Sequence, residues 1–171
     1  MTSAEKRRVQ YKKLVVDIKD DLNSIQNLVK DIEEVAKALE NNKGPLRGSD
    51  LMACAGYLHH YFTGVESIFE RISRAFDGSQ PPGGDYHREL LHSMTVTIPE
   101  IRPRIISRDI AEELDEYRRF RHMFRHAYGS ELRWRKMEPL VKGVASLTET
   151  LVDQISGFMH FVETLSDSLV L

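Results

Sequence analysis

The chain has 171 residues, 41% hydrophobic and 29% charged, with a formal net charge of −2, which fits a single domain with a buried core. The single cysteine, Cys54, excludes a disulfide framework, and the overall charge alone argues neither for nor against nucleic acid. No apolar run approaches the roughly 18 residues of a membrane span, and residues 1–13 lack the apolar core of a signal peptide. We therefore expect a cytoplasmic protein with one domain over residues 1–171.

The first element is a long helix from about residue 3 to residue 40. Thr2 and Glu5 have the spacing of a capping box, and Gly44 with Pro45 ends the pattern. Apolar residues recur every three or four positions between these signals: Leu14, Ile18, Leu22, Ile25, Val29, Ile32, Ala36 and Leu39. A helix of this length measures about 57 Å, so we expect it to extend beyond its own domain and to offer a surface to a partner.

The second helix is predicted from Ser49 or Asp50 to Phe76, with the same apolar spacing over eight residues: Leu51, Ala55, Leu58, Phe62, Val65, Phe69, Ile72 and Phe76. His59 and Glu66 fall at the edges of this stripe, where packing or solvation is the ordinary role. The glycine- and proline-rich residues 77–84 predict a loop.

Three further segments complete the chain. A short helix is expected from Asp85, followed by an extended connection over 95–106 that contains two prolines. A helix then begins after Ser107 and stops at Gly129, and a last helix follows Ser130 with a bend or restart at Pro139. Four substantial amphipathic helices predict an all-α, up-and-down four-helix bundle with one short extra helix.

Arg121 lies on the apolar side of the helix predicted after Ser107. At about 100° per residue, it falls within about 20° of Ile110, between Leu114 and Tyr117. A charged side chain is uncommon in such a place unless it is paired, lines a cleft or meets a ligand. Arg121 is therefore the first candidate for a functional residue.

The surrounding segment is strongly basic. Residues 118–136, called the basic segment below, contain seven arginines and lysines and one acid, Glu131, which gives a local charge of +6 and leaves −8 for the rest of the chain. This segment is a candidate site for an anion.

His126 supplies a second chemical group near Arg121. Cleavage of an RNA phosphodiester needs a base, an acid and positive charge on the phosphate, and a histidine with an arginine supplies these without metal. On a straight helix, however, Arg121 and His126 are about 140° apart. Either the helix unwinds before His126, or a second subunit completes the site.

Two other interpretations remain open. His122 and His126 stand four residues apart, as zinc ligands on a helix sometimes do, although no third ligand is evident. The arginines and histidines can also be the ordinary decoration of a helix end. The chain has no glycine-rich phosphate loop, no Gly-x-Ser-x-Gly motif and no paired cysteines.

The spacing of Arg121, four residues, His126, one residue and Tyr128 resembles the signature of the HEPN superfamily, specifically of the HepT-like toxins. The stretch from Ala55 to Glu66 also resembles HepT-like chains. The resemblance implies one HEPN-like helical domain and a metal-independent endoribonuclease without a cofactor. It further implies a homodimer in which both motifs line one cleft.

The resemblance also implies roles for individual residues. Arg121 binds the scissile phosphate and His126 is the general acid and base, with support from three neighbours: His122, Arg125 and Arg118. Tyr128 is the position at which a minimal nucleotidyltransferase antitoxin attaches AMP, and an adenylate there would block the cleft and cancel positive charge.

The leading hypothesis is therefore the toxin of a toxin–antitoxin pair that cleaves RNA and is inhibited by AMPylation. The alternative is a non-catalytic helical module that binds a nucleotide or a partner protein through the basic segment, Arg118–Lys136.

Overall fold

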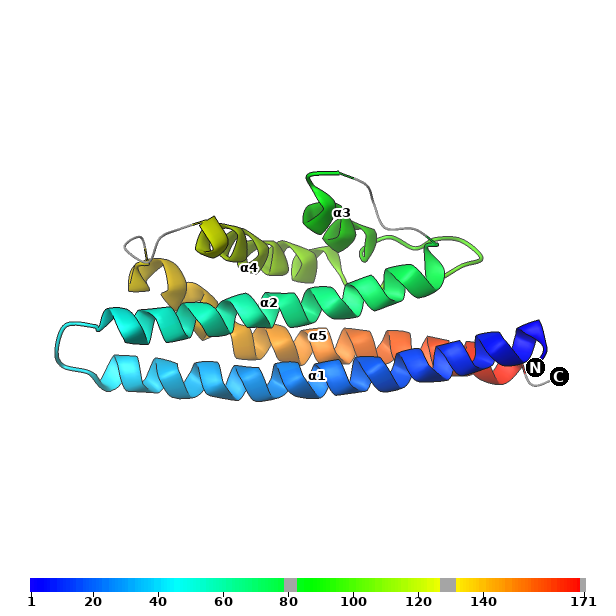
Figure 1. The fold of residues 1–171 in the computed structure, drawn as a ribbon, viewed down its shortest axis with the longest axis horizontal. Coiled ribbons are helices and arrows are strands. Elements are labelled where there is room, and N and C mark those ends of the chain that lie inside the picture. Colours follow the sequence, from blue (N-terminus) through cyan, green and yellow to red (C-terminus); the bar gives the residue numbers. More distant parts are fainter. Residues whose placement is uncertain (79–82, 127–131, 170–171) are drawn as a thin grey trace.

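The computed structural model of the chain describes residues 1–78, 83–126 and 132–169, which contain five α-helices and no strand. The helices are α1 (Ser3–Asn41), α2 (Gly48–Phe76), α3 (Tyr86–Ser93), α4 (Arg108–His126) and α5 (Trp134–Ser168). The four long helices alternate in direction along the chain (Figure 1). The predicted all-α bundle of four long helices and one short helix is confirmed.

Helix α2 is the centre of the bundle, because it contacts each of the other four helices. Helices α1 and α5 lie along one side of it, and α3 and α4 lie along the other (Figure 1). Gly64 permits the close approach of α1, since a Cβ atom there would lie 3.1 Å from Cγ1 of Ile25. Residues on α2 therefore have access to side chains from both layers.

Helix α1 begins with the predicted capping box, in which Glu5 N donates to Thr2 Oγ1 at 3.1 Å and Thr2 N donates to Glu5 Oε2 at 2.7 Å. The helix does not extend beyond its domain, and that expectation was wrong. Ser166 Oγ of α5 donates to the carbonyl of Arg8 near one end, and Leu39 is buried near the other. The ends of α5 and α2 accompany this helix, so its length alone implies no partner.

Helix α5 is one continuous element that begins at Trp134 and contains Pro139. The predicted restart at Pro139 is absent, although proline supplies no N–H for the helix and leaves the carbonyl four residues earlier without that bond. Pro139 is exposed, which leaves water access to that part of the helix. Among the described residues, no helix combines the length and the apolar character that a membrane span requires.

The connection between α3 and α4 is organised around a buried arginine that the sequence did not single out. Ile98 N donates to the carbonyl of Arg102 at 2.9 Å, and Arg102 N returns a bond to the carbonyl of Ile98 at 3.0 Å. The Arg102 guanidinium binds both oxygens of Asp77, with Nε to Oδ1 at 2.7 Å and Nη2 to Oδ2 at 2.8 Å. This turn therefore attaches the connection to the end of α2.

We expect the substitution Asp77→Ala to lower the free energy of unfolding by about 3–5 kcal/mol, because it leaves the buried Arg102 charge without its partner. The measurement is urea unfolding followed by circular dichroism. Lys142→Ala, which removes an exposed ion pair with Glu138, is the control and should change the stability little. A loss below about 1 kcal/mol for Asp77→Ala would contradict the role of this ion pair.

Candidate functional site

Helix α4 buries one face against the bundle, and Arg121 belongs to that face. The buried residues of α4 are Ile110, Leu114, Tyr117, Phe120 and Arg121, and the Arg121 side chain is only 7% exposed. The helical spacing of the sequence predicted this placement, and the structure confirms it. A guanidinium remains charged in proteins, so a buried one requires partners.

The principal partner of Arg121 is Glu66 of α2. Arg121 Nη1 donates to Glu66 Oε1 at 2.9 Å and also lies 3.3 Å from Thr63 Oγ1. The guanidinium lies over the Phe62 ring, 5.2 Å from its centroid, in the range of a cation–π contact. Arg121 is thus paired within its own chain, and the ordinary packing or solvation role predicted for Glu66 was wrong.

The second oxygen of Glu66 contacts a residue from a third helix. His87 of α3 places Nδ1 2.7 Å from Glu66 Oε2, and Arg121 Nη2 lies 3.3 Å from the same Nδ1. We call Glu66, His87 and Arg121 the buried-edge cluster. It joins α2, α3 and α4 at one point, where Glu66 and Arg121 are buried and the His87 side chain is 41% exposed.

His87 was not among the candidate residues that the sequence indicated. Its position depends on where α3 packs, and residues 77–85, which precede α3 in the chain, have no periodic pattern in the sequence. The available signal was indirect: Glu66 ends the stretch of α2 that resembles HepT-like chains, and an acid on an otherwise apolar edge is a reason to look for a buried cation.

His122 and His126 belong to the same helix as Arg121 but not to its buried face. Both are exposed near the C-terminal end of α4, with ring centroids 4.6 Å apart. Helix α4 runs through His126 without unwinding, so the alternative of an unwound helix end was wrong. The structure therefore does not bring Arg121 and His126 together on one face of the chain, and Tyr128 lies outside the described residues.

The arginines of the basic segment differ in whether a carboxylate is paired with them. Arg118 Nε donates to Asp115 Oδ1 at 2.6 Å, and Arg119 Nε lies 2.8 Å from Asp115 Oδ2. Burial raises the pKa of Asp115, but the hydrogen bond and charge of Arg118 and the charge of Arg119 outweigh it and lower the pKa. Arg125 is exposed, and no carboxylate among the described residues pairs with it.

His59 lies one helical turn before Thr63 and near Arg121. Its ring packs against Phe124, with centroids 5.5 Å apart, and its Nδ1 is buried without a hydrogen-bond partner among the described residues. Burial lowers the pKa of His59 below the ordinary value, and the positive charges of Arg121, His60 and Arg125 lower it further. These effects therefore favour the neutral form of the His59 ring.

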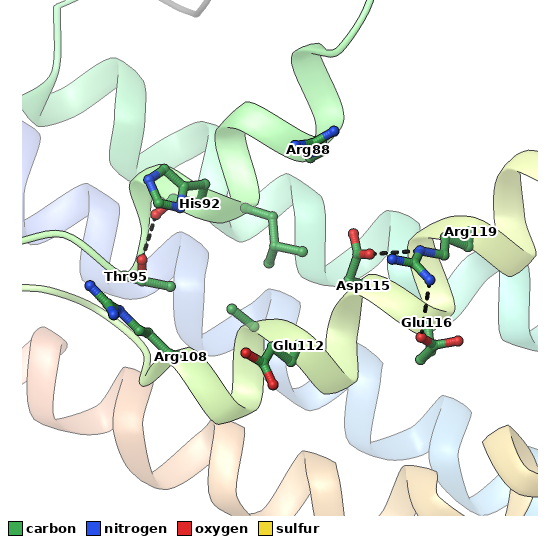
Figure 2. A pocket seen from close by; sticks show the side chains of 10 residues that line it. Arg88, His92, Thr95, Arg108, Glu112, Asp115, Glu116 and Arg119 are labelled. Atoms are coloured by element: carbon green, nitrogen blue, oxygen red, sulfur yellow. Dashed lines mark hydrogen bonds and ion pairs between the residues drawn. The ribbon is translucent and has the colours of Figure 1, made fainter.

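A surface hollow of about 660 Å³ lies between α3 and α4. Figure 2 shows Arg88, His92 and Arg108 around it, with Arg119 bonded to Asp115 and Glu116. Neither the buried-edge cluster nor His126 lines this hollow. It is lined by acids as well as arginines, so it is not a uniformly positive anion site.

The described residues contain no group of three or more histidine, cysteine, aspartate or glutamate side chains that could hold a metal ion. Cys54 of α2 is buried, and burial raises the pKa of its thiol to about 11. A thiol in this state is a poor nucleophile.

Substitution of Glu66 tests the pairing of Arg121. We expect Glu66→Ala to lower the free energy of unfolding by about 3–5 kcal/mol, since it leaves the Arg121 charge buried and unpaired. In an Arg121→Met background the same substitution should cost less, and the difference between the two costs, the coupling energy, should be about 1–3 kcal/mol. Urea unfolding of the four proteins measures this, and additive effects would contradict the pairing.

The lowered pKa of His59 predicts a pH dependence of stability. The unfolded chain takes up a proton near pH 6.5, whereas folded His59 takes it up only at lower pH. The stabilising contribution is thus present above pH 6.5 and is lost as the pH falls through the folded pKa. Between pH 7 and pH 5, the free energy of unfolding measured in urea should fall less for His59→Gln than for the wild type or the control His160→Gln.

Comparison with known proteins adds one finding. A family model described as HepT-like protein matches residues 53–162, which include nearly all of α2, α3, α4 and most of α5. No curated protein and no solved structure gives a significant match. The family match covers more than half of the chain and agrees with the resemblance carried by the Arg121, His126 and Tyr128 spacing. The chain therefore belongs to the HepT-like protein family.

Proposed function

We propose that this protein is the toxin of a toxin–antitoxin pair and acts as a metal-independent endoribonuclease. The observation that carries the proposal is the HepT-like family match over residues 53–162, within which Arg121 and His126 stand at the spacing of the HEPN signature. Family membership suggests a HEPN-type toxin ribonuclease, and the metal-independent mechanism and the individual residue roles are our extension of it.

In the proposed reaction, Arg121 stabilises the charge on the scissile phosphate and His126 transfers the proton. His122 and Arg125 are exposed beside His126 and would contact the RNA backbone. Arg118 is already engaged by Asp115, so we assign it to placing Asp115 and the α4 surface rather than to binding phosphate.

A second copy of the chain is proposed to complete the site. Helix α4 is continuous through His126, and the turn angle of about 140° between Arg121 and His126 separates them on a single helix. Two copies related by a two-fold axis would bring His126 of one chain toward Arg121 of the other. The proposed assembly is therefore a homodimer with one composite cleft.

Tyr128 is proposed as the control point, where a minimal nucleotidyltransferase antitoxin would attach AMP. The residue follows the C-terminal end of α4 by two positions, close in sequence to the exposed His126 and Arg125. An adenylate there would add negative charge beside groups that must bind RNA, which weakens binding and obstructs the cleft.

One observation favours the alternative of a non-catalytic binding module. The Arg121 guanidinium is buried and bonded to Glu66, and it must move or share this partner to reach a phosphate. A module that uses only the exposed basic residues of the basic segment would need no such movement. Binding that weakens with salt, without any cleaved product, would favour this alternative.

The decisive experiment is cleavage of RNA by the purified protein in a chelator. We expect wild-type protein to produce fragments, and His126→Ala to lose about 10²–10⁴-fold in rate because proton transfer is removed. The control is His160→Ala, an exposed histidine on α5, which should cleave at the wild-type rate. Unchanged cleavage by His126→Ala would overturn the proposal, as would a requirement for added metal.

Mixing two inactive variants tests the composite cleft. If Arg121 and His126 act from different chains, a heterodimer of His126→Ala and Arg121→Met contains one site with both wild-type residues. Activity should therefore return on mixing and subunit exchange. A mixture that stays inactive while heterodimers form would contradict a site shared between subunits.

A further inference from the structure

The proton on His87 can be placed from the geometry of the buried-edge cluster. Glu66 Oε1 accepts a bond from the Arg121 guanidinium at 2.9 Å, and a permanently charged, buried guanidinium requires an ionised partner, so Glu66 is a carboxylate. Its other oxygen lies 2.7 Å from His87 Nδ1. A carboxylate oxygen can only accept hydrogen bonds. If Nδ1 were unprotonated, its lone pair would face a lone pair of Glu66 Oε2 at this distance, and the two would repel. His87 Nδ1 therefore carries a proton and donates it to Glu66.

The contact with Arg121 agrees with this assignment. Arg121 Nη2 lies 3.3 Å from His87 Nδ1, but a protonated Nδ1 cannot accept a bond, so the two groups are neighbours rather than a donor and an acceptor. Glu66 is shared between them and holds both in place. The shorter distance, to the carboxylate, decides which atom receives the bond.

The second ring nitrogen of His87 is consequently available. In the neutral imidazole with Nδ1 protonated, Nε2 has the lone pair and is the basic atom. Within the described ranges, no group forms a hydrogen bond with Nε2, and the side chain is 41% exposed. A carboxylate that fixes the tautomer and orientation of a histidine, and leaves Nε2 free, is the arrangement of a general base.

The charged groups that face His87 come from two other helices, and a neutral tyrosine comes from its own. Glu66 of α2 faces Nδ1, Arg121 of α4 lies beside it, and Tyr86 of α3 packs edge-on with ring centroids 5.3 Å apart. Tyr86 in turn donates to Glu70 of α2 at 3.0 Å. The neighbourhood thus contains the cation that a phosphate requires and a base on the same edge of one chain.

We propose that His87 is the general base of the RNA-cleaving reaction and acts beside Arg121, with Glu66 as its positioning residue. This inference rests on the proposed ribonuclease function and divides its chemistry between two histidines. His87 Nε2 removes the proton from the ribose 2′-hydroxyl as the 2′-oxygen bonds to phosphorus. The P–O5′ bond breaks, and the departing 5′-oxygen takes a proton from His126. The products are a 2′,3′-cyclic phosphate and a 5′-hydroxyl. His87 then returns its proton to water, and His126 regains one from water.

The test compares His87→Gln and His87→Ala with His92→Gln, a control on an exposed part of the same helix. We expect His87→Gln to lower kcat for a short RNA by about 10²–10³-fold with KM within about threefold. The decline of kcat toward acid pH, which reports protonation of the base, should be lost in His87→Gln. Free imidazole should restore part of the activity of His87→Ala.

Several outcomes would overturn the inference. His87→Gln within about threefold of the wild-type kcat, or a uniform loss that leaves the acid decline in place, would show that His87 is not the base. Long-range ¹H–¹⁵N NMR of the wild type, with His87→Gln for assignment, should show the neutral ring protonated at Nδ1. A proton on Nε2 would exclude the proposed base whatever the kinetics.

The same assay separates this inference from the proposed function. Cleavage by the wild type that is lost in His126→Ala but retained in His87→Gln would leave the ribonuclease standing and remove only the role of His87. No cleavage by the wild type would remove both. Circular dichroism of each variant verifies folding, which the partial exposure of His87 is expected to preserve.

Discussion

The ion pair between Arg121 and Glu66 is the interaction on which the arrangement of this bundle depends. An arginine on the buried face of α4 costs several kcal/mol unless a carboxylate meets it. Helix α2, which contacts all the other helices, provides that carboxylate as Glu66. The pair fixes the rotation of α4 against α2. Because His87 also binds Glu66, the same carboxylate fixes one side of α3.

This arrangement places the chemistry of the proposed ribonuclease in two regions. One is the buried-edge cluster, where Arg121 and His87 share Glu66. The other is the exposed end of α4, where His122, Arg125 and His126 lie. A single chain keeps them apart because α4 is a regular helix through His126, and the proposed dimer would join them without distorting that helix. Stability and chemistry then draw on the same arginine, so a variant at Arg121 must be examined for both.

Arg102 shows a second use of a buried guanidinium. It binds both oxygens of Asp77 and the carbonyls of Val96 and Ser93, so its charge and hydrogen-bonding capacity are consumed inside the fold. Arg121 differs because its partner Glu66 also contacts a partly exposed histidine. The two arginines are similarly buried, so burial does not distinguish them. The exposure of the neighbouring group distinguishes Arg102, the structural case, from Arg121, the functional one.

The helices, their apolar faces and the burial of Arg121 could be predicted from the sequence, because a period of 3.6 residues is a local property of the chain. The Arg121, His126 and Tyr128 spacing indicated the family for the same reason. The partners could not be predicted and became visible only in the folded chain: Glu66 for Arg121, His87 for Glu66 and Asp77 for Arg102. The first and third pairs join residues 55 and 25 positions apart, and each depends on how helices pack and where irregular connections place them. Contacts between residues so far apart in the chain depend on helix packing and loop geometry, which leave no periodic pattern in the sequence.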